Sequence, residues 1–200
     1  MAGAEREPRI APGTRREIGL VNALIARLIG AATGGGPPNV FTTLARHRRL
    51  YRPWLRFARV LMPGGTLPRA DAELVILRVG HNCDCAYELR QHERLALGAG
   101  LPAEQIAATA IGADAGCWTA RQALLLRAVD ELHSTRTLSD DLWADLSGEF
   151  DQTQLIELPM LAGHYEMLAM TLNSLRVRPD RVASGPPGWL VRLLTKGGRR

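Results

Sequence analysis

The sequence has few aromatic residues, which occupy 5% of its 200 positions, so its core must be built mainly from Ala, Leu, Val and Ile. Such side chains favour helices that pack closely together. The sequence also lacks a run of about 18 apolar residues, the length of a membrane span. No alternating apolar and polar run with β-branched residues occurs either. These absences predict an all-α fold and no membrane partner.

Cysteine is also scarce. Three cysteines cannot form a fully paired disulfide framework, and they indicate a reducing compartment: Cys83, Cys85 and Cys117. Residues 18–32 form the most signal-like stretch, but Arg27 interrupts it and no clean cleavage pattern follows. We therefore predict a cytoplasmic protein.

Lysine occurs once, at Lys196, so arginine supplies nearly all of the positive charge, and the formal net charge is +5. The arginines are spread over many expected helices rather than gathered into one basic stripe. We therefore predict no nucleic-acid partner. Hydrophobic residues reach 46% and charged residues 22%, which is the balance of a globular protein.

Stretches rich in glycine and proline divide the chain. A capping box at Thr14 and Glu17 predicts a helix that extends to about Ala32, and the run at 34–38 breaks it. Further prolines follow Val177. The predicted parts are an N-terminal arm at 1–36, a helical domain at 37–177 and a basic C-terminal tail at 178–200.

Apolar residues recur at helical spacing along most of the chain. The helix expected after Pro68 is apolar on most of its surface, so we place it at the centre of the fold. Asn82 is a suitable N-cap for the next helix, which is expected to reach Gly98. Other predicted helices cover residues 40–47, 50–62, 119–133, 140–148 and, from a capping box at Asp151 and Gln154, about 152–175.

One segment carries most of the candidate chemistry. Cys85, Glu88 and His92 follow one another at i, i+3 and i+7, which places them within about 60° of one another on a helix. Glu73 lies on the preceding helix and could meet this stripe across the interface. A carboxylate can hold an imidazole in one tautomer or share its proton, and histidine titrates near neutrality. We therefore predict these four residues as catalytic.

Cys85 is subject to opposing influences. A helix N-terminus favours its thiolate, whereas Asp84 and Glu88 oppose it by charge repulsion, so the sign of its pKa shift stays open. Cys83 is a possible redox partner, although side chains at i and i+2 of a helix point to nearly opposite faces. No His/Cys/Asp cluster has metal-ligand spacing, so neither a metal nor a cofactor is expected. Residues expected to line the pocket are Leu77, Arg78, Tyr87, Leu89, His164 and Tyr165, with Arg78 as the holder of a substrate anion.

This segment resembles the core of the carboxymuconolactone decarboxylase family, which includes the alkyl hydroperoxidase D-like proteins. The similarity extends to Asn39–His47, Pro63–Arg69 and Glu157–Leu175, and it covers roughly Val40 to Val177. The resemblance implies an all-helical fold in which helices pack around a motif-bearing helix pair. It also implies assembly as trimers or hexamers.

The family motif sharpens the functional alternatives. Its peroxidase members carry Glu-x11-Cys-x2-Cys-x3-His, in which two cysteines do redox chemistry while the glutamate and the histidine relay protons. Glu73, Cys85 and His92 match this motif, whereas Glu88 replaces the second cysteine. The lactone decarboxylases of the family likewise lack the redox pair.

Three hypotheses follow. The first is a carboxymuconolactone decarboxylase-like enzyme in which His92 moves a proton next to a carboxylate or lactone carbonyl and Glu73 orients it. The alternative is a thiol-dependent peroxide reductase, with peroxiredoxin-type activity, in which Cys85 forms a sulfenic acid resolved by Cys83 or an external thiol. A second alternative is a non-enzymatic, ligand-binding homo-oligomer in which the Glu/His cluster is a buried polar network.

Overall fold

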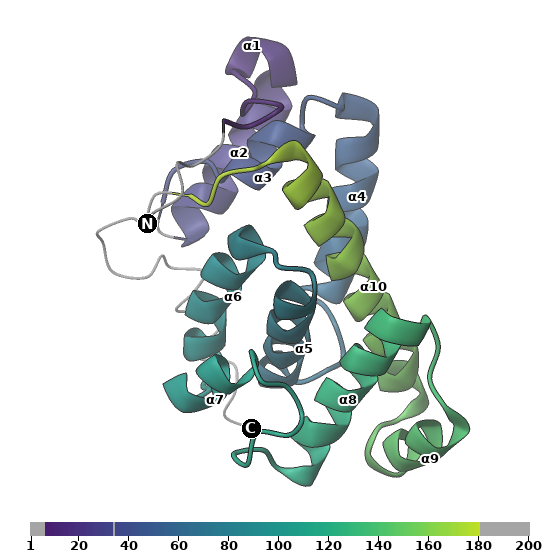
Figure 1. The fold of residues 1–200 in the computed structure, drawn as a ribbon. Coiled ribbons are helices and arrows are strands. Elements are labelled where there is room, and N and C mark those ends of the chain that lie inside the picture. Colours follow the sequence, from purple (N-terminus) through teal and green to yellow (C-terminus); the bar gives the residue numbers. More distant parts are fainter. Residues whose placement is uncertain (1–6, 34, 181–200) are drawn as a thin grey trace.

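A computed structural model describes residues 7–33 and 35–180 of the chain (Figure 1). Within these residues the regular structure is helical throughout and contains no strand, which confirms the all-α prediction. The helices are α1 (Arg15–Ile18), α2 (Leu20–Thr33), α3 (Asn39–Leu44), α4 (Arg48–Leu61), α5 (Arg69–Asn82), α6 (Ala86–Gly98), α7 (Ala103–Ala108), α8 (Ala120–Thr135), α9 (Asp140–Glu149) and α10 (Gln152–Leu175).

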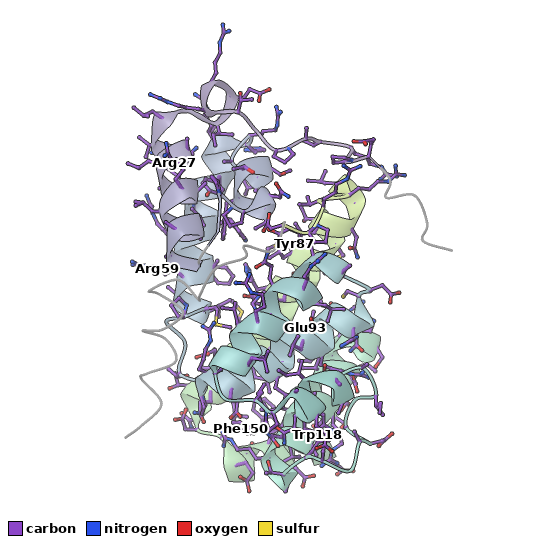
Figure 2. The ribbon with its side chains drawn as sticks, turned by 90° about the vertical axis from the view of Figure 1, so that its left-hand side faces the viewer. Arg27, Arg59, Tyr87, Glu93, Trp118 and Phe150 are labelled. Carbon is purple, nitrogen blue, oxygen red and sulfur yellow. The ribbon has the colours of Figure 1, made fainter. Side chains whose placement is uncertain are left out.

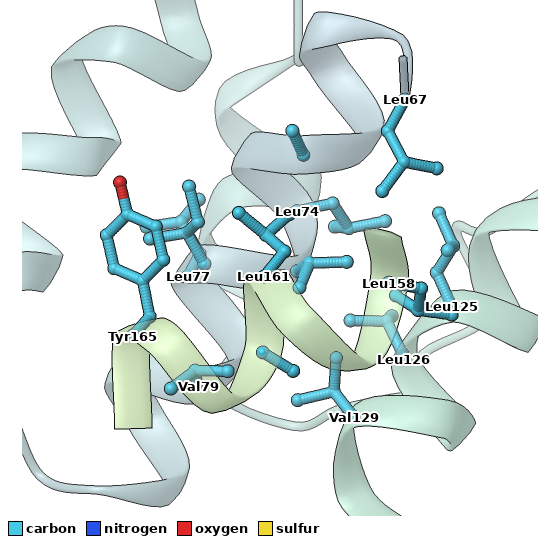
Figure 3. Packing of buried hydrophobic residues seen from close by; sticks show 14 of the residues in the cluster. Leu67, Leu74, Leu77, Val79, Leu125, Leu126, Val129, Leu158, Leu161 and Tyr165 are labelled. Carbon is cyan, nitrogen blue, oxygen red and sulfur yellow. The ribbon is translucent and has the colours of Figure 1, made fainter. Parts of the chain in front are cut away.

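Helix α5 lies at the centre and packs against α6, α8 and α10 (Figure 1). Its burial on nearly every side matches the apolar surface expected of the helix after Pro68. Figure 3 shows side chains of α5, α8 and α10 meeting in one core, among them Leu74, Leu126 and Leu161. Each fully buried leucine contributes about 1.5–3 kcal/mol to stability, so this interface fixes the position of α5.

The turn before α5 is held by a buried carboxylate from α10. Glu157 accepts hydrogen bonds from the backbone N–H of Thr66, at 2.5 Å, and from that of Leu67, at 3.2 Å. The Thr66 hydroxyl donates to the same carboxylate at 2.6 Å. Since these bonds join α10 to the residues just before Arg69, they determine where the central helix begins.

The N-terminal helix differs from its prediction. The capping box of Thr14 and Glu17 is present, but α1 ends at Ile18 and a second helix starts at Leu20. Gly19 separates them with a φ of +84°, a conformation that side chains disfavour but that glycine adopts at little cost. The expectation of one continuous helix to Ala32 is therefore wrong at this residue.

The junction between α5 and α6 also differs. Asn82 does not cap α6, because α5 continues through Asn82 and its side chain donates to Asp130 on α8, at 2.8 Å. Cys85 is the N-cap instead, and its N–H donates to the carbonyl of Gly80 at 2.8 Å. Cys83 and Cys85 thus lie in a tight turn between the helices rather than within one helix.

Two other predicted helix boundaries differ from the structure by a few residues. The helix expected at 40–47 ends at Leu44, and the one expected at 50–62 begins at Arg48, because the His47 side chain accepts a hydrogen bond from the N–H of Leu50 and caps α4. The capping box of Asp151 and Gln154 starts α10 as predicted. In the described ranges no helix is long and apolar enough to cross a membrane.

The described chain ends against the helical domain. The Asp180 carboxylate accepts hydrogen bonds from the Tyr87 hydroxyl, at 2.6 Å, and from the Gln91 amide, at 2.8 Å. Its other oxygen accepts from the N–H of Asn39, at 2.7 Å. The first residues of the predicted tail are therefore attached to α3 and α6, and its remainder, residues 181–200, lies outside the described residues.

Candidate active site

Glu73 and His92 form a buried pair between α5 and α6. Oε2 of Glu73 lies 2.6 Å from Nδ1 of His92, and Oε1 lies 2.5 Å from the guanidinium of Arg69, one turn earlier on α5. The Glu73 side chain is completely buried, so the nearby positive group compensates a carboxylate that water cannot reach. Because Nδ1 faces Glu73, Nε2 is the ring nitrogen left to exchange a proton with a bound molecule.

Glu88 lies one turn before His92 on the same face of α6. Within the described part of the chain, neither of its carboxylate oxygens has a partner with hydrogen-bond geometry. Burial raises the pKa of Glu88 to about 8, and the Cys85 thiol offsets only part of this rise. Glu88 is therefore mainly protonated at neutral pH and can act as a proton donor.

Tyr165 of α10 completes this buried group. Its ring meets the His92 ring edge-on, with the centroids 5.0 Å apart and the planes at 89°. Burial raises the pKa of Tyr165, and the charges of Glu73 and Glu88 raise it further. Tyr165 therefore stays protonated, and the structure brings it together with Glu73, Glu88 and His92 as the sequence predicts.

Cys85 joins the site from the turn before α6, and its side chain is fully buried. Burial raises the pKa of the Cys85 thiol to about 12, with a further contribution from the charge of Glu88. The question that the sequence left open is thus answered against the thiolate. Because the thiolate is the nucleophilic form, Cys85 is a poor nucleophile in this conformation.

Arg78 does not belong to this site. It follows Glu73 by five residues, which turns it about 140° around α5. Its guanidinium pairs with Asp130 at 2.5 Å and donates to the carbonyls of Thr109 and Ala110. The prediction that Arg78 holds a substrate anion is therefore wrong. Arg69 is the basic residue at the site, and its i, i+4 spacing from Glu73 is the signal that could have found it.

Two other residues expected at the pocket point elsewhere. Tyr87 lies where α6 approaches the N-terminal helices, and its hydroxyl accepts a hydrogen bond from the N–H of Val40 (Figure 2). His164 meets the Tyr165 ring edge-on, with the centroids 5.3 Å apart, but its ring stacks on Trp54 of α4 with the centroids 6.2 Å apart. Burial lowers the pKa of His164 to about 4, so it is neutral at pH 7.

Apolar neighbours close the site. Leu77 is buried in the core, and Leu89 packs so closely against α5 that a Cβ at Gly80 would lie 2.9 Å from its side chain.

A hollow of about 560 Å³ lies on the Arg78 side of α5, where Asp130, Ser134 and Asp145 also line it. Of the four predicted catalytic residues, His92 is the most exposed at 8%, and the other three are buried more completely.

Cys83 lies in a different environment from the one expected for a redox partner. Its sulfur is within 4.8 Å of possible ligand atoms of His133 on α8 and Glu166 on α10. Sequence analysis missed this group because its members come from three elements that are distant along the chain.

Comparison with known proteins agrees with this architecture. Residues 48–131 match the model of the carboxymuconolactone decarboxylase family. No curated protein sequence matches the chain. The alkylhydroperoxidase AhpD core of a peroxidase-related protein from Ralstonia eutropha JMP134 is similar, with a TM-score of 0.75 at 15% identity over 88% of this chain and 94% of that one.

Two further structures show the same fold. A peroxidase-related protein from Silicibacter sp. TM1040 gives a TM-score of 0.76 at 13% identity, over 90% of this chain and 96% of that one. The debrominase Bmp8 gives 0.70 at 12% identity, over 94% and 96%. The family match and these structures confirm the resemblance seen in the sequence, and the fold is alkylhydroperoxidase D-like.

Proposed function

We propose that the protein is a small-molecule enzyme of the carboxymuconolactone decarboxylase type, which decarboxylates or isomerises a lactone or carboxylate by acid/base chemistry. One observation carries this proposal: a buried Glu73–His92 pair lies beside Glu88, a carboxylic acid that burial keeps protonated. A carboxylic acid that stays protonated beside an imidazole held by a carboxylate can serve as the general acid while the imidazole serves as the general base.

Each residue has a distinct part in this chemistry. Glu73 holds Nδ1 of His92, so Nε2 faces the substrate and removes a proton from a carbon next to a carboxylate or lactone carbonyl. In an isomerisation, Glu88 donates its proton to the oxygen on which negative charge develops. In a decarboxylation, the C–C bond to the carboxylate breaks, CO2 leaves, and the proton of Glu88 goes to the carbon that keeps the electron pair. Arg69 compensates the charge of Glu73, and the protonated Tyr165 borders the His92 ring. The buried Cys85 side chain fills space beside these residues and does not act as a nucleophile.

The substrate test uses carboxymuconolactone as the probe. Wild-type protein in D2O should catalyse exchange or loss of the activated carbon's proton, which nuclear magnetic resonance detects even when the later steps are slow. Replacing His92 by Gln should slow this reaction by about 10²- to 10⁴-fold, because a positioned general base contributes that much. Full activity in His92→Gln would remove His92 from the mechanism.

A control variant makes this test specific. His47 is exposed and caps α4, far from the α5–α6 interface, so His47→Gln should keep the wild-type rate. Circular dichroism should show the same helical content in both variants. Equal loss of activity in both variants would indicate a general effect on the protein and would count against the proposal.

A thiol-dependent peroxide reductase is the second candidate, because the similar structures include peroxidase-related proteins. This activity requires a thiolate that attacks the peroxide. Burial raises the pKa of Cys83 to about 11 and that of Cys85 to about 12, and Glu88 replaces the second cysteine of the motif. Because a peroxidase needs a reactive thiolate, these features favour the acid/base enzyme over the peroxide reductase. A non-enzymatic, ligand-binding oligomer remains if neither carboxymuconolactone nor peroxide is consumed.

We also propose that the chain assembles with copies of itself. One face of α2 exposes four apolar side chains, each more than half accessible to solvent: Leu20, Val21, Leu24 and Leu28. A contiguous apolar face of this kind marks an interaction surface. Light scattering of the full chain in solution measures the number of copies, for which the family resemblance implies three or six.

We further propose a cytoplasmic location. The free cysteines Cys83, Cys85 and Cys117 are compatible with the reducing compartment expected from the sequence.

A further inference from the structure

A second group of ionisable residues gathers where the C-terminal end of α5 meets α8 and α10. Cys83 follows α5, His133 lies in the last turn of α8, and Glu166 lies in α10. A possible ligand atom from each, the sulfur, a ring nitrogen and a carboxylate oxygen, lies within 4.8 Å of the other two. Nδ1 of His133 is 2.6 Å from Oε1 of Glu166.

The spacing of these atoms suits a small metal ion. Tetrahedral zinc holds sulfur at about 2.3 Å and nitrogen or oxygen at about 2.0–2.2 Å, which places its ligand atoms roughly 3.4–3.6 Å apart. The three donors therefore need to move by about 1 Å or slightly more. A thiol and an imidazole are poor ligands for Mg²⁺ and Ca²⁺, which prefer oxygen, so the donor set selects zinc among the common divalent ions.

We propose that Cys83, His133 and Glu166 bind one zinc ion, with a fourth position open to water or a small ligand. Three protein ligands and an open position are typical of reactive rather than purely structural zinc sites. The ion would take the place of the proton shared by Nδ1 of His133 and Oε1 of Glu166. It would also displace the thiol proton of Cys83, so binding releases protons.

Neighbouring groups already hold two of the ligands in position. The guanidinium of Arg136 lies 2.8 Å from Oε2 of Glu166, which leaves Oε1 directed at the cluster. The side-chain amide of Asn173 donates to the carbonyl of Cys83 at 2.8 Å and fixes the turn that carries the sulfur. Such outer contacts orient metal ligands in known sites and lower the cost of assembling them.

The cluster is also accessible. The side chain of His133 is 36% exposed and that of Glu166 is 18% exposed, so an ion can enter from solvent without opening the core. Zinc binds cysteine as the thiolate and histidine as the neutral imidazole, so the metal must compete with protons for its ligands. We therefore expect zinc affinity to rise with pH.

The test is a cobalt titration of the full chain after treatment with a chelator. Co²⁺ reports thiolate ligation by a charge-transfer absorption band that zinc then abolishes by displacement. We expect one cobalt per chain and a band that disappears in Cys83→Ser. Cys117→Ser is the matched control, since Cys117 lies outside the cluster, and it should keep the band.

The other two ligands give an independent readout. His133→Gln and Glu166→Gln should each weaken zinc binding by roughly tenfold or more, measured by competition with a chromophoric chelator. Zinc should raise the melting temperature of wild type but not that of Cys83→Ser. Absence of the band in wild type, its persistence in Cys83→Ser or its loss in Cys117→Ser would each overturn the proposal. None of these outcomes depends on the enzymatic activity.

Discussion

The molecule contains two Arg–Glu–His groups of similar local geometry in different surroundings. In the first, Glu73 contacts His92 at 2.6 Å and Arg69 at 2.5 Å. In the second, Glu166 contacts His133 at 2.6 Å and an arginine at 2.8 Å. The contacts are nearly the same, so any difference in function must come from burial and from the neighbouring side chains.

Burial separates the two groups. Glu73 is fully buried, and the His92 that it contacts lies one turn after Glu88, a second buried carboxyl group that has lost its charge. Glu166 is partly exposed, and its neighbour is the Cys83 thiol. A dry environment strengthens electrostatic interactions and shifts pKa values, whereas an accessible one admits ions. The same three residue types therefore suit proton transfer in one place and metal binding in the other.

Removing the carboxylate charge of Glu73 or of Glu166 should give the largest difference in stability between the two groups. Glu73→Gln leaves Arg69 and His92 without their buried counter-charge, so we expect the free energy of unfolding to fall by about 3–5 kcal/mol. Glu166→Gln breaks a more exposed pair, and its expected cost is about 1 kcal/mol or less. Urea unfolding of both variants measures the difference. Similar losses would show that burial does not distinguish the two groups.

Much of this arrangement was predictable from the sequence, for physical reasons. The apolar surface of the segment after Pro68 could only be satisfied at the centre of a helical fold, and α5 lies there. The spacing of Glu88 and His92 placed them on one face of α6 because helical periodicity is local. Glu73 was expected to meet this face from the preceding helix, and the pair at 2.6 Å confirms that contact.

The errors concern long-range contacts. Asn82 has the chemistry of an N-cap, but Asp130 on α8 binds its side chain and the helix continues past it. The same aspartate pairs with Arg78, which its spacing of five residues from Glu73 already turns to another side of α5. Asp130 lies about fifty positions along the chain from both, so no local pattern reveals its influence. The cluster at Cys83 likewise depends on how α8 and α10 cross α5.

The pH dependence of the free energy of unfolding reports the protonation of Glu88. Its pKa is about 8 in the folded protein and near 4.5 when the chain unfolds, so between these values the folded state holds a proton that the unfolded state has lost. Stability is therefore greatest at low pH in this window and falls as pH rises. From about pH 5.5 to about 8 we expect a loss of about 3 kcal/mol from this group.

Glu88→Gln provides the comparison, because an amide of similar shape does not titrate. The variant should match wild type near pH 5.5 and exceed its stability near pH 8, as measured by urea unfolding at both values. Glu166→Gln, in the exposed group, should follow the wild-type pH profile more closely than Glu88→Gln does. A wild-type profile that stays flat through this window would mean that Glu88 is ionised in the folded protein.

The smallest expected effect distinguishes the two thiols beside these groups. Cys85 is completely buried and its pKa is raised to about 12, whereas Cys83 is partly exposed with a pKa of about 11. At neutral pH iodoacetamide should therefore modify Cys83 roughly tenfold faster than Cys85, and mass spectrometry of the digested protein measures both rates. Zinc should protect Cys83 and leave the rate at Cys85 unchanged. Rapid modification of Cys85, or peroxide consumption that Cys85→Ser abolishes, would instead favour the peroxide reductase, because both require a reactive thiolate at the buried position.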